Sequence, residues 1–335
     1  MTPLLERTLW HPVAMGHVVG SQPLAVTLLG EELVLWRDGA GAAQAWLDQC
    51  PHRGARFSMG RVEDGQIECP YHGWRFEGGG QCTRIPATPQ FTPGPRYHAQ
   101  TFEVQEAYGM VWVRLEAPQG QALPIHALPV FAAETEARLR KTTSGPYFVK
   151  ASAPRIIENF LDMAHFGYVH EGWLGSRAHT VIEPYEVKPT ATGVRATGCF
   201  AWQPQSSIHA QGGAQVEYTY EVSAPYMAVL TKQPEPGSTA IEGLWESIAM
   251  FVCPISEESS MAWTRMAMND FRSPDARLIN FQDHIFSQDQ PILESQRPKR
   301  LPLAPHAEAH GSADRMSTAY RRYLKESGIT WGVSL

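Results

Sequence analysis

The stretch CPHRGARFSMGRVEDGQIECPYHGW, residues 50–74, carries two Cys–His pairs in one short window. The pairs are Cys50 with His52 and Cys69 with His72, and sixteen residues separate them. The flanking segments have the apolar alternation and turn residues of short strands, so we expect both pairs on loops at strand ends. Four side chains that bind metals, placed on two loops, indicate a metal centre.

Three kinds of site compete for these four residues. A disulfide between Cys50 and Cys69 is disfavoured, because five cysteines in 335 residues are too few for a disulfide scaffold. The N-terminal segment MTPLLERTLWHPVAM also lacks the pattern of a signal peptide, so we expect a reducing, cytoplasmic location. Structural zinc usually takes its cysteines together and its histidines together. Mixed pairs instead favour a Rieske [2Fe–2S] cluster, in which two thiolates hold one iron and two imidazoles the other.

The overall composition is that of a globular protein of more than one domain. The chain is 43% hydrophobic and 19% charged, with a net charge of -6. It has no block of Lys and Arg, which argues against nucleic acid as the main partner. No apolar run approaches the roughly 18 residues of a membrane-spanning helix, so we expect no membrane partner.

The pattern along the chain changes near residues 117–129, a segment with several prolines and a glycine that we interpret as a linker. Before it lie short strands, including a hairpin over 24–38 around Gly30 and a strand at 110–115. After it we expect a helix over 154–172, a helix that starts at 273–275 and is disturbed at Pro291, and an amphipathic helix over 312–327. Between the helices, strands are expected at 194–203, 215–223, 226–232, 244–253 and 261–268. The predicted fold class is therefore α+β, with a small all-β domain over residues 1–117 and a larger domain over 118–335.

The segment ENFLDMAHFGYVHEG, residues 158–172, suggests a second metal site. Asn159, Asp162 and His165 are spaced to share one face of a helix. His170 is off that face, so the helix would have to loosen at Gly167 for both histidines to reach one ion. Two histidines plus one carboxylate make the facial triad of non-heme iron(II) sites, but 34 acidic residues leave the carboxylate open.

The sequence resembles the Rieske non-heme iron oxygenases, in their oxygenase (α) component. The resemblance rests on CPHRGA and CPYHGW, and it extends from WHPVA at 10–14 to YRRYLKE at 320–326. It implies that Cys50 and Cys69 ligate one iron of a [2Fe–2S] cluster and that His52 and His72 ligate the other. It also implies a catalytic domain of the helix-grip type, with an antiparallel sheet flanked by helices and a mononuclear Fe(II).

The segment FSQDQPILESQRP, residues 286–298, resembles the Asp-x-Pro segment of Rieske oxygenases that act on single carbon centres, notably the purine-alkaloid N-demethylases. This resemblance implies Asp289 as the third iron ligand beside His165 and His170. Asp162 would connect this iron, through His165, to His72 of a neighbouring subunit in a homotrimer. Asn159 is either a hydrogen-bond donor beside the iron ligands or an ordinary polar residue of the helix.

The resemblance implies that a separate reductase or ferredoxin delivers the electrons. The sequence agrees, since no GxGxxG nucleotide-binding fingerprint follows a strand in this chain. With O₂, the enzyme would hydroxylate, or N- or O-demethylate, a planar aromatic or heterocyclic small molecule. A ring cis-dihydroxylating dioxygenase is the alternative, and a Rieske electron carrier would leave 154–172 and 289 without a role. The expected pocket walls are Phe166, Val169, Phe281, Gln282, Ile285 and Phe286.

Overall fold

The structure, a computed structural model, describes residues 4–335 and divides into two compact units between Ala122 and Leu123. The sequence prediction placed the division at residue 117, at the start of the same proline-containing segment. No helix in the described part of the chain combines the length and the apolar character that a bilayer crossing requires.

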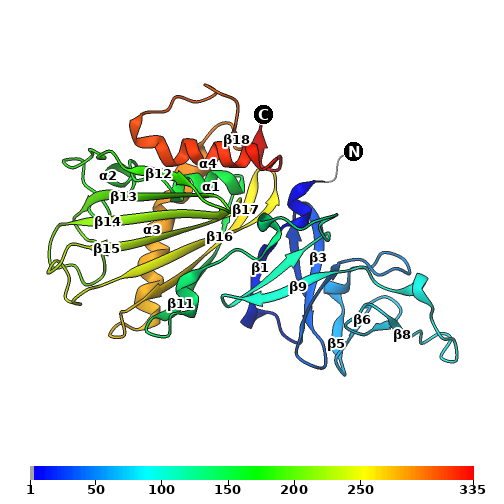
Figure 1. The fold of residues 1–335 in the computed structure, drawn as a ribbon. Helices are drawn as coiled ribbons and strands as arrows, with labels where there is room; N and C mark the ends of the chain where they lie inside the picture. The colour runs from blue at the N-terminus through cyan, green and yellow to red at the C-terminus, as the bar shows by residue number, and fades with distance from the viewer. Residues whose placement is uncertain (1–3) are drawn as a thin grey trace. The chain divides into compact units, whose positions relative to one another are not determined.

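The first unit is all-β and is built on a six-stranded antiparallel sheet (Figure 1). Its strand order is β1-β10-β9-β4-β3-β2. The hairpin predicted around Gly30 is confirmed, since Leu29 and Gly30 both have positive φ, at 51° and 78°, in a tight turn between two strands. The strands are β1 (His11–Met15), β2 (Leu24–Leu28), β3 (Glu31–Arg37), β4 (Ala43–Leu47), β9 (Thr101–Ala107) and β10 (Met110–Arg114).

A second, four-stranded sheet carries the two Cys–His loops. Its strands follow the order β5 (Arg61–Glu63), β6 (Gln66–Glu68), β7 (Arg75–Phe76) and β8 (Cys82–Arg84). Trp46 is fully buried against Trp36, Phe57 and Phe76, each of which it meets edge to face. This aromatic core fixes the base from which the two loops project. Short 3₁₀ helices lie at Leu5–Thr8, Gly16–Val18, Phe57–Met59 and Pro95–Tyr97.

The second unit contains a seven-stranded antiparallel sheet in the order β11-β17-β16-β15-β14-β13-β12. The five strands expected from the sequence correspond to β13 through β17, whereas β11 and β12 were not predicted. The side chains of β14 alternate between buried and exposed, as in a sheet with one covered face. The strands are β11 (Arg140–Val149), β12 (Glu186–Pro189), β13 (Val194–Gln203), β14 (Ala214–Ala224), β15 (Met227–Pro234), β16 (Glu246–Ser256) and β17 (Ser259–Met268).

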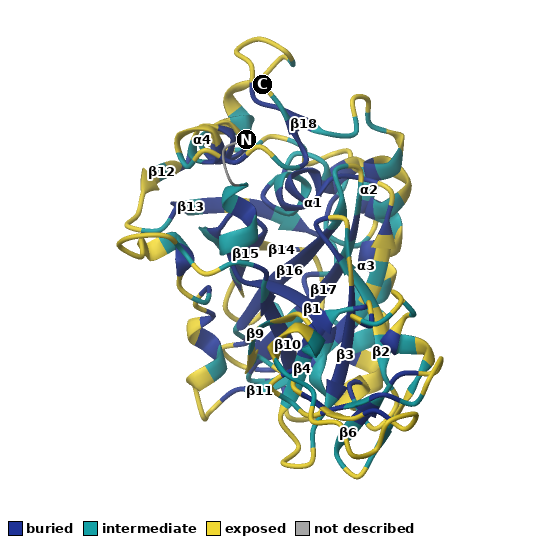
Figure 2. Cartoon of the chain, turned by 90° about the vertical axis from the view of Figure 1, so that its right-hand side faces the viewer, coloured by how far each residue is buried: buried dark blue, intermediate teal, exposed yellow. Residues whose placement is uncertain are grey.

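Four helices pack on this sheet, and the long α3 crosses one face of it (Figures 1 and 2). They are α1 (Ala153–Phe160), α2 (Phe166–Val169), α3 (Asp275–Ser295) and α4 (Arg315–Glu326). The α+β class and the antiparallel sheet flanked by helices are confirmed. A two-stranded parallel ladder joins β18 (Leu301–Pro302) to β19 (Val333–Ser334), and 3₁₀ helices lie at Pro124–His126, Ala132–Thr135 and Ser312–Asp314.

Two helix predictions were wrong in detail. The segment 154–172 is not one helix, because the Asp162 carboxylate accepts the backbone N–H of Ala164 at 2.7 Å and turns the chain between α1 and α2. Gly167 lies inside α2, where a side chain would come within 3.0 Å of the Ser176 carbonyl oxygen, so it permits close packing rather than the break. Pro291 lies within α3, which continues to Ser295 because Leu293 is buried beyond it.

Candidate metal centres

The two Cys–His loops have the same backbone construction. In the first, the Cys50 N–H donates to the Ala55 carbonyl at 2.8 Å and the Gly54 N–H returns to the Cys50 carbonyl at 2.9 Å. In the second, the Cys69 N–H donates to the Trp74 carbonyl at 2.9 Å and the Gly73 N–H donates to the Cys69 carbonyl at 3.1 Å. Gly54 and Gly73 both have positive φ, at 71° and 67°, which side chains rarely adopt. Each loop therefore presents its cysteine and its histidine from a tight, glycine-closed turn.

The thiols and the imidazoles form two separate pairs. The two cysteine side chains interact with each other, and this interaction lowers the pKa of Cys69 and raises that of Cys50. The His52 and His72 ring centroids are 4.6 Å apart, and His52 stacks on Trp74 at 4.4 Å. Both cysteines are buried, whereas His72 is exposed.

This arrangement fits a two-iron cluster better than a single ion. Among residues 4–335, only His165, His170 and Asp289 form a group of three or more ligand atoms lying within 4.8 Å of one another. The two thiols and two imidazoles do not converge in this way, as four ligands of one zinc ion must. His52 Nδ1 is also buried without a hydrogen-bond partner among the described residues, as expected of a nitrogen that would ligate a metal.

The second centre is assembled from the two ends of α2 and one face of α3. His165 immediately precedes α2 and His170 immediately follows it, so one short helix presents both imidazoles. Asp289 projects from α3 and is buried. Because α2 ends at Val169 and the backbone leaves the helical conformation at His170 (φ −108°, ψ 32°), two residues five apart in sequence can reach the same point.

The three ligand atoms lie at the spacing that one metal ion requires. His165 Nε2 is 3.2 Å from His170 Nε2 and 3.4 Å from Asp289 Oδ1. His170 Nε2 is 3.3 Å from the same oxygen. Ligands at right angles and about 2.1 Å from an ion are about 3 Å apart, so the set fits a facial triad with open positions.

The other nitrogen of each imidazole is held by a second side chain. His165 Nδ1 lies 3.1 Å from Asp162 Oδ2, and His170 Nδ1 lies 2.8 Å from Gln288 Oε1. A carboxylate or amide oxygen at Nδ1 selects the tautomer whose Nε2 lone pair faces the ion. Asn159 donates from Nδ2 to Asp289 Oδ1 at 3.3 Å, which orients the carboxylate.

The electrostatics of the set favour a cation. Burial alone would raise the pKa of Asp289, but hydrogen bonds from His165 and His170 outweigh it and lower that pKa to about 2. Burial alone would lower the pKa of His165, whereas Asp162 and Asp289 raise it to about 9. Two carboxylates around one imidazole therefore make this position electronegative.

A cavity enclosing about 640 Å³ of empty space, open to solvent, lies beside these residues. Its apolar walls come from α3 and from the covered face of β14, β15 and β16. The apolar walls, with a few polar side chains grouped at one end, are those of a small-molecule site. The lining residues are Asn159, Phe160, His165, Phe166, His170, Leu174, Tyr218, Leu230, Lys232, Ile248, Met250, Phe281, Gln282, Ile285, Phe286 and Asp289.

Five of the six expected wall residues line this cavity, and Val169 does not. Val169 is the last residue of α2, and the chain turns His170 rather than Val169 toward the cavity. The sequence analysis also missed Gln288 and the wall residues on the strands. Alternation along 227–234 could have indicated Leu230 and Lys232 as neighbours on one covered face.

Comparison with known proteins identifies both units. Residues 10–106 match the family model described as "Rieske [2Fe-2S] domain", and residues 149–328 match "Vanillate O-demethylase oxygenase C-terminal domain". The chain is similar to methylxanthine N1-demethylase NdmA of Pseudomonas putida, with 30% identity over 330 residues, covering 96% of this chain and 88% of that protein. The solved structure of NdmA with caffeine covers 96% of this chain and 90% of its own, with a TM-score of 0.79 and 28% identity.

Two further relatives share parts of the chain. The probable methylxanthine N7-demethylase NdmC of Pseudomonas sp. (strain TJI-51) is 38% identical over 229 residues, which is 68% of this chain and 78% of that protein. The oxidoreductase NdmD of Pseudomonas putida is 37% identical over 123 residues, or 36% of this chain and 21% of that protein.

These matches decide between the alternatives. An electron carrier is excluded because the second family covers a separate oxygenase domain, and the relatives favour the monooxygenase reading over a ring-dihydroxylating dioxygenase. The chain belongs to the Rieske non-heme iron oxygenases, as an oxygenase component of the monooxygenase type that uses a [2Fe–2S] cluster and a mononuclear iron.

Proposed function

We propose that this oxygenase component removes a methyl group from a planar N-heterocycle by monooxygenation of the methyl carbon. The proposal is carried by the similarity to two methylxanthine N-demethylases, together with the apolar cavity beside His165, His170 and Asp289. O-Demethylation of an aryl ether and hydroxylation of an alkyl carbon are the neighbouring reactions, because they oxidise the same kind of C–H bond.

In this proposal Cys50 and Cys69 hold one iron of the cluster and His52 and His72 the other. His165, His170 and Asp289 hold the mononuclear iron. Bound there, the two centres would supply electron transfer and the activation of O₂. Asp162, Gln288 and Asn159 keep the three ligand side chains oriented through their hydrogen bonds.

The cavity walls would position the substrate. Phe286 stacks on Tyr147 with ring centroids 4.1 Å apart, so its ring is held as a fixed wall of α3. Phe166 and Ile285 add apolar surface, and a flat, uncharged ring would bury well among them. Positioning decides which carbon is oxidised, because misplacement by about 1 Å costs orders of magnitude in rate.

Electrons would come from a separate reductase or ferredoxin. We further propose a homotrimeric ring in the cytoplasm, in which Asp162 accepts a hydrogen bond from His72 of the next chain. This idea is supported by the position of Asp162, whose side chain is 27% exposed while its Oδ2 contacts His165. A head-to-tail ring makes the same contact at every interface.

The proposed reaction can be tested with the iron-loaded enzyme and a surrogate reductase. Caffeine and theobromine are offered with ¹⁸O₂, and formaldehyde and products are measured by mass spectrometry. We expect one formaldehyde and one demethylated ring per methyl group lost, with no oxygen atom from O₂ in the ring product. A cis-diol product containing both atoms of one O₂ would contradict the proposal.

A further inference from the structure

A buried ion pair lies on the covered face of the catalytic sheet. Lys232 on β15 and Glu246 on β16 face each other across the strand pair, and only 6% and 8% of their surfaces are exposed. Lys232 Nζ lies 2.8 Å from Glu246 Oε2 and donates to the Ser206 carbonyl oxygen at 2.9 Å. Two opposite charges thus stand in a wall that is otherwise mostly apolar.

This pair faces two adjoining cavities. Lys232 lines the cavity beside the iron ligands and also a second, small cavity, which Glu246 lines as well. Gln282 and Phe281 line both cavities, so the two spaces share one boundary. Gln282 precedes Asp289 by seven residues on α3, which places the boundary about 10 Å along the helix from the iron ligand.

Stability alone does not account for the pair. Removing two charges from water is costly, and apolar residues of similar volume often replace a buried ion pair without loss of stability. The pair is also incompletely satisfied, because Glu246 Oε2 has no hydrogen-bond partner with proper alignment among the described residues. The Lys232 ammonium has three N–H groups; Ser206 accepts one and Glu246 faces a second, which leaves one N–H for a ligand.

The spare groups define what a ligand should offer. The ammonium can donate to a carbonyl oxygen, and the Glu246 carboxylate can accept from an N–H beside it. A carboxylate ligand would leave two negative charges against one ammonium, whereas a neutral amide edge leaves the charge balanced.

We propose that Lys232 and Glu246 form a recognition site for a neutral amide-type edge of the substrate, a ring lactam or a carboxamide, at the end of the pocket away from the iron. This inference rests on the proposed function, in which the same substrate presents its methyl group to the iron at the other end. It narrows the substrate class to neutral molecules with a methyl group and an amide edge on opposite sides.

Three ligands that share one methoxyphenyl ring test the site. 4-Methoxybenzamide carries the amide edge, 4-methoxybenzoate carries a carboxylate, and 4-methylanisole carries neither. Their dissociation constants are measured by isothermal titration calorimetry on the full enzyme without a reductase, so that no turnover occurs. We expect the wild-type enzyme to bind the benzamide most tightly and Lys232→Met to weaken that binding about tenfold or more, with 4-methylanisole unchanged.

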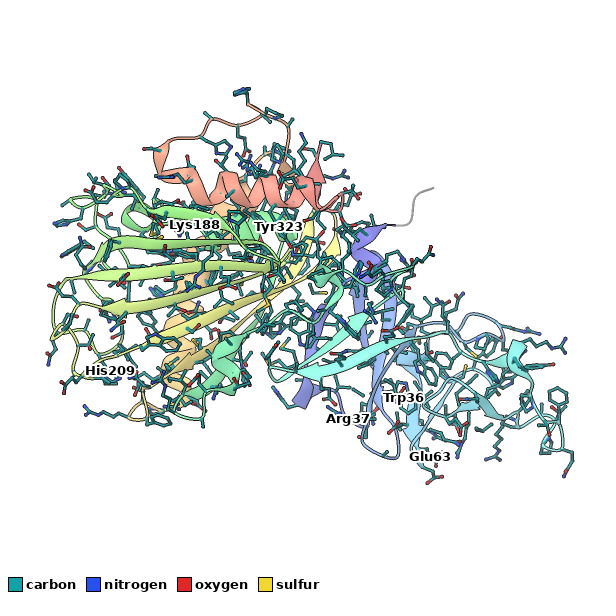
Figure 3. All side chains as sticks on the ribbon, in the orientation of Figure 1. Trp36, Arg37, Glu63, Lys188, His209 and Tyr323 are labelled. Atoms are coloured by element: carbon teal, nitrogen blue, oxygen red, sulfur yellow. The ribbon has the colours of Figure 1, made fainter. Side chains whose placement is uncertain are left out.

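Glu246→Gln should change the ligand preference, which it would not do if the pair had only a structural role. It leaves the ammonium uncompensated, so the benzoate should gain affinity relative to the benzamide. Lys188→Met is the matched control, because Lys188 on β12 pairs with Glu186 at 2.7 Å on the exposed surface (Figure 3) and should change none of the three constants.

Equal weakening of all three ligands by Lys232→Met, or a wild-type preference for the benzoate, overturns the proposal. If Lys232→Met fails to fold, Lys232→Met/Glu246→Leu removes both charges together and should lose the benzamide preference; if that variant keeps the preference, the proposal is wrong. Iron content and formaldehyde release from the same preparations report on the proposed function separately, since a binding preference needs no turnover.

Discussion

His170 illustrates how a single hydrogen bond sets up a metal ligand. Its Nδ1 is fixed by Gln288, the residue directly before Asp289 on α3. One turn of α3 therefore supplies both a proposed ligand and the group that orients another. The sequence analysis selected Asp289 from a family pattern, but nothing in that pattern marks Gln288, because its role depends on a contact between residues 118 positions apart.

Replacing Gln288 by Leu should weaken the iron site without abolishing it. Loss of the oxygen at Nδ1 frees the His170 ring to rotate and to change tautomer, and such changes typically cost about 10–100-fold in metal affinity. Iron titration into the metal-depleted enzyme measures the effect. Gln290→Leu is the control, because the Gln290 amide bonds to Phe148 and Glu294 instead; equal losses in both variants would contradict the orienting role.

Asp289→Ala should separate the two metal centres. We expect total iron to fall from about three to about two per chain, because the cluster keeps its own ligands in the other unit. The visible absorption of the cluster should remain while turnover is lost. Glu294→Ala, which removes a carboxylate from the same helix, should keep both iron and turnover; normal activity in Asp289→Ala would show that another carboxylate is the ligand.

At the scale of elements, α1 is tied to α4 and to the 303–311 loop by a charged network. Glu158 on α1 pairs with Arg155 on the same helix at 3.6 Å and with Arg321 on α4 at 2.5 Å. Glu308 also contacts both arginines, at 2.6 Å from Arg155 and 2.5 Å from Arg321. Burial alone would raise the pKa of Glu308, but the two guanidinium groups outweigh it and lower that pKa to about 2. The network holds the helix that leads into the His165 turn.

Glu308→Gln should lower the free energy of unfolding at pH 7 by roughly 1–2 kcal/mol, a value discounted because the side chain is 29% exposed. The folded pKa lies below the ordinary value of 4.5. The stabilisation is therefore complete above about pH 4.5 and is lost as the pH falls toward 2.

Urea unfolding of Glu308→Gln and the wild-type enzyme over this pH range measures the difference. The difference in the free energy of unfolding between the two proteins should shrink as the pH falls below 4.5. Glu186→Gln, which alters an exposed pair with Lys188, serves as the control and should differ little from the wild type at every pH. A gap that persists unchanged at pH 2–3 would show that Glu308 acts through packing rather than charge.

Sequence patterns located the elements whose side chains alternate or repeat, and they failed where a local contact overrides the pattern. The strands β13 to β17 followed from their β-rich composition, with clean alternation in β14. In contrast, β12 is only four residues long and exposed, and β11 contains Gly145 and Pro146, which obscure it. The helix break at Asp162 depends on a side chain that bonds its own backbone. The Lys232–Glu246 pair depends on strand register, which a single sequence does not specify.

For the whole molecule, the proposed ring predicts that electrons pass between chains. A Cys50→Ala chain lacks the cluster and a His165→Ala chain has a damaged iron site, so each homotrimer alone should be inactive. In every trimer that contains both kinds of chain, an intact iron follows an intact cluster at one of the three positions. Turnover of the isolated mixed trimers should therefore recover to about a third of the wild-type value per chain. Co-expression with two affinity tags isolates mixed assemblies, and no recovery in verified mixtures would exclude the route through Asp162.

The proposed iron ligands come from two places far apart in the chain, with His165 and His170 flanking α2 and Asp289 on α3. A divalent ion bound by both segments would cross-link the chain and close a loop of more than a hundred residues. The binding free energy of the ion would then add to the stability of the fold. Enzyme made under iron limitation should therefore melt at a lower temperature and be cleaved sooner by proteases. The yield of folded protein from a culture would then depend on the iron supply of the cells as well as on the stability of the chain itself.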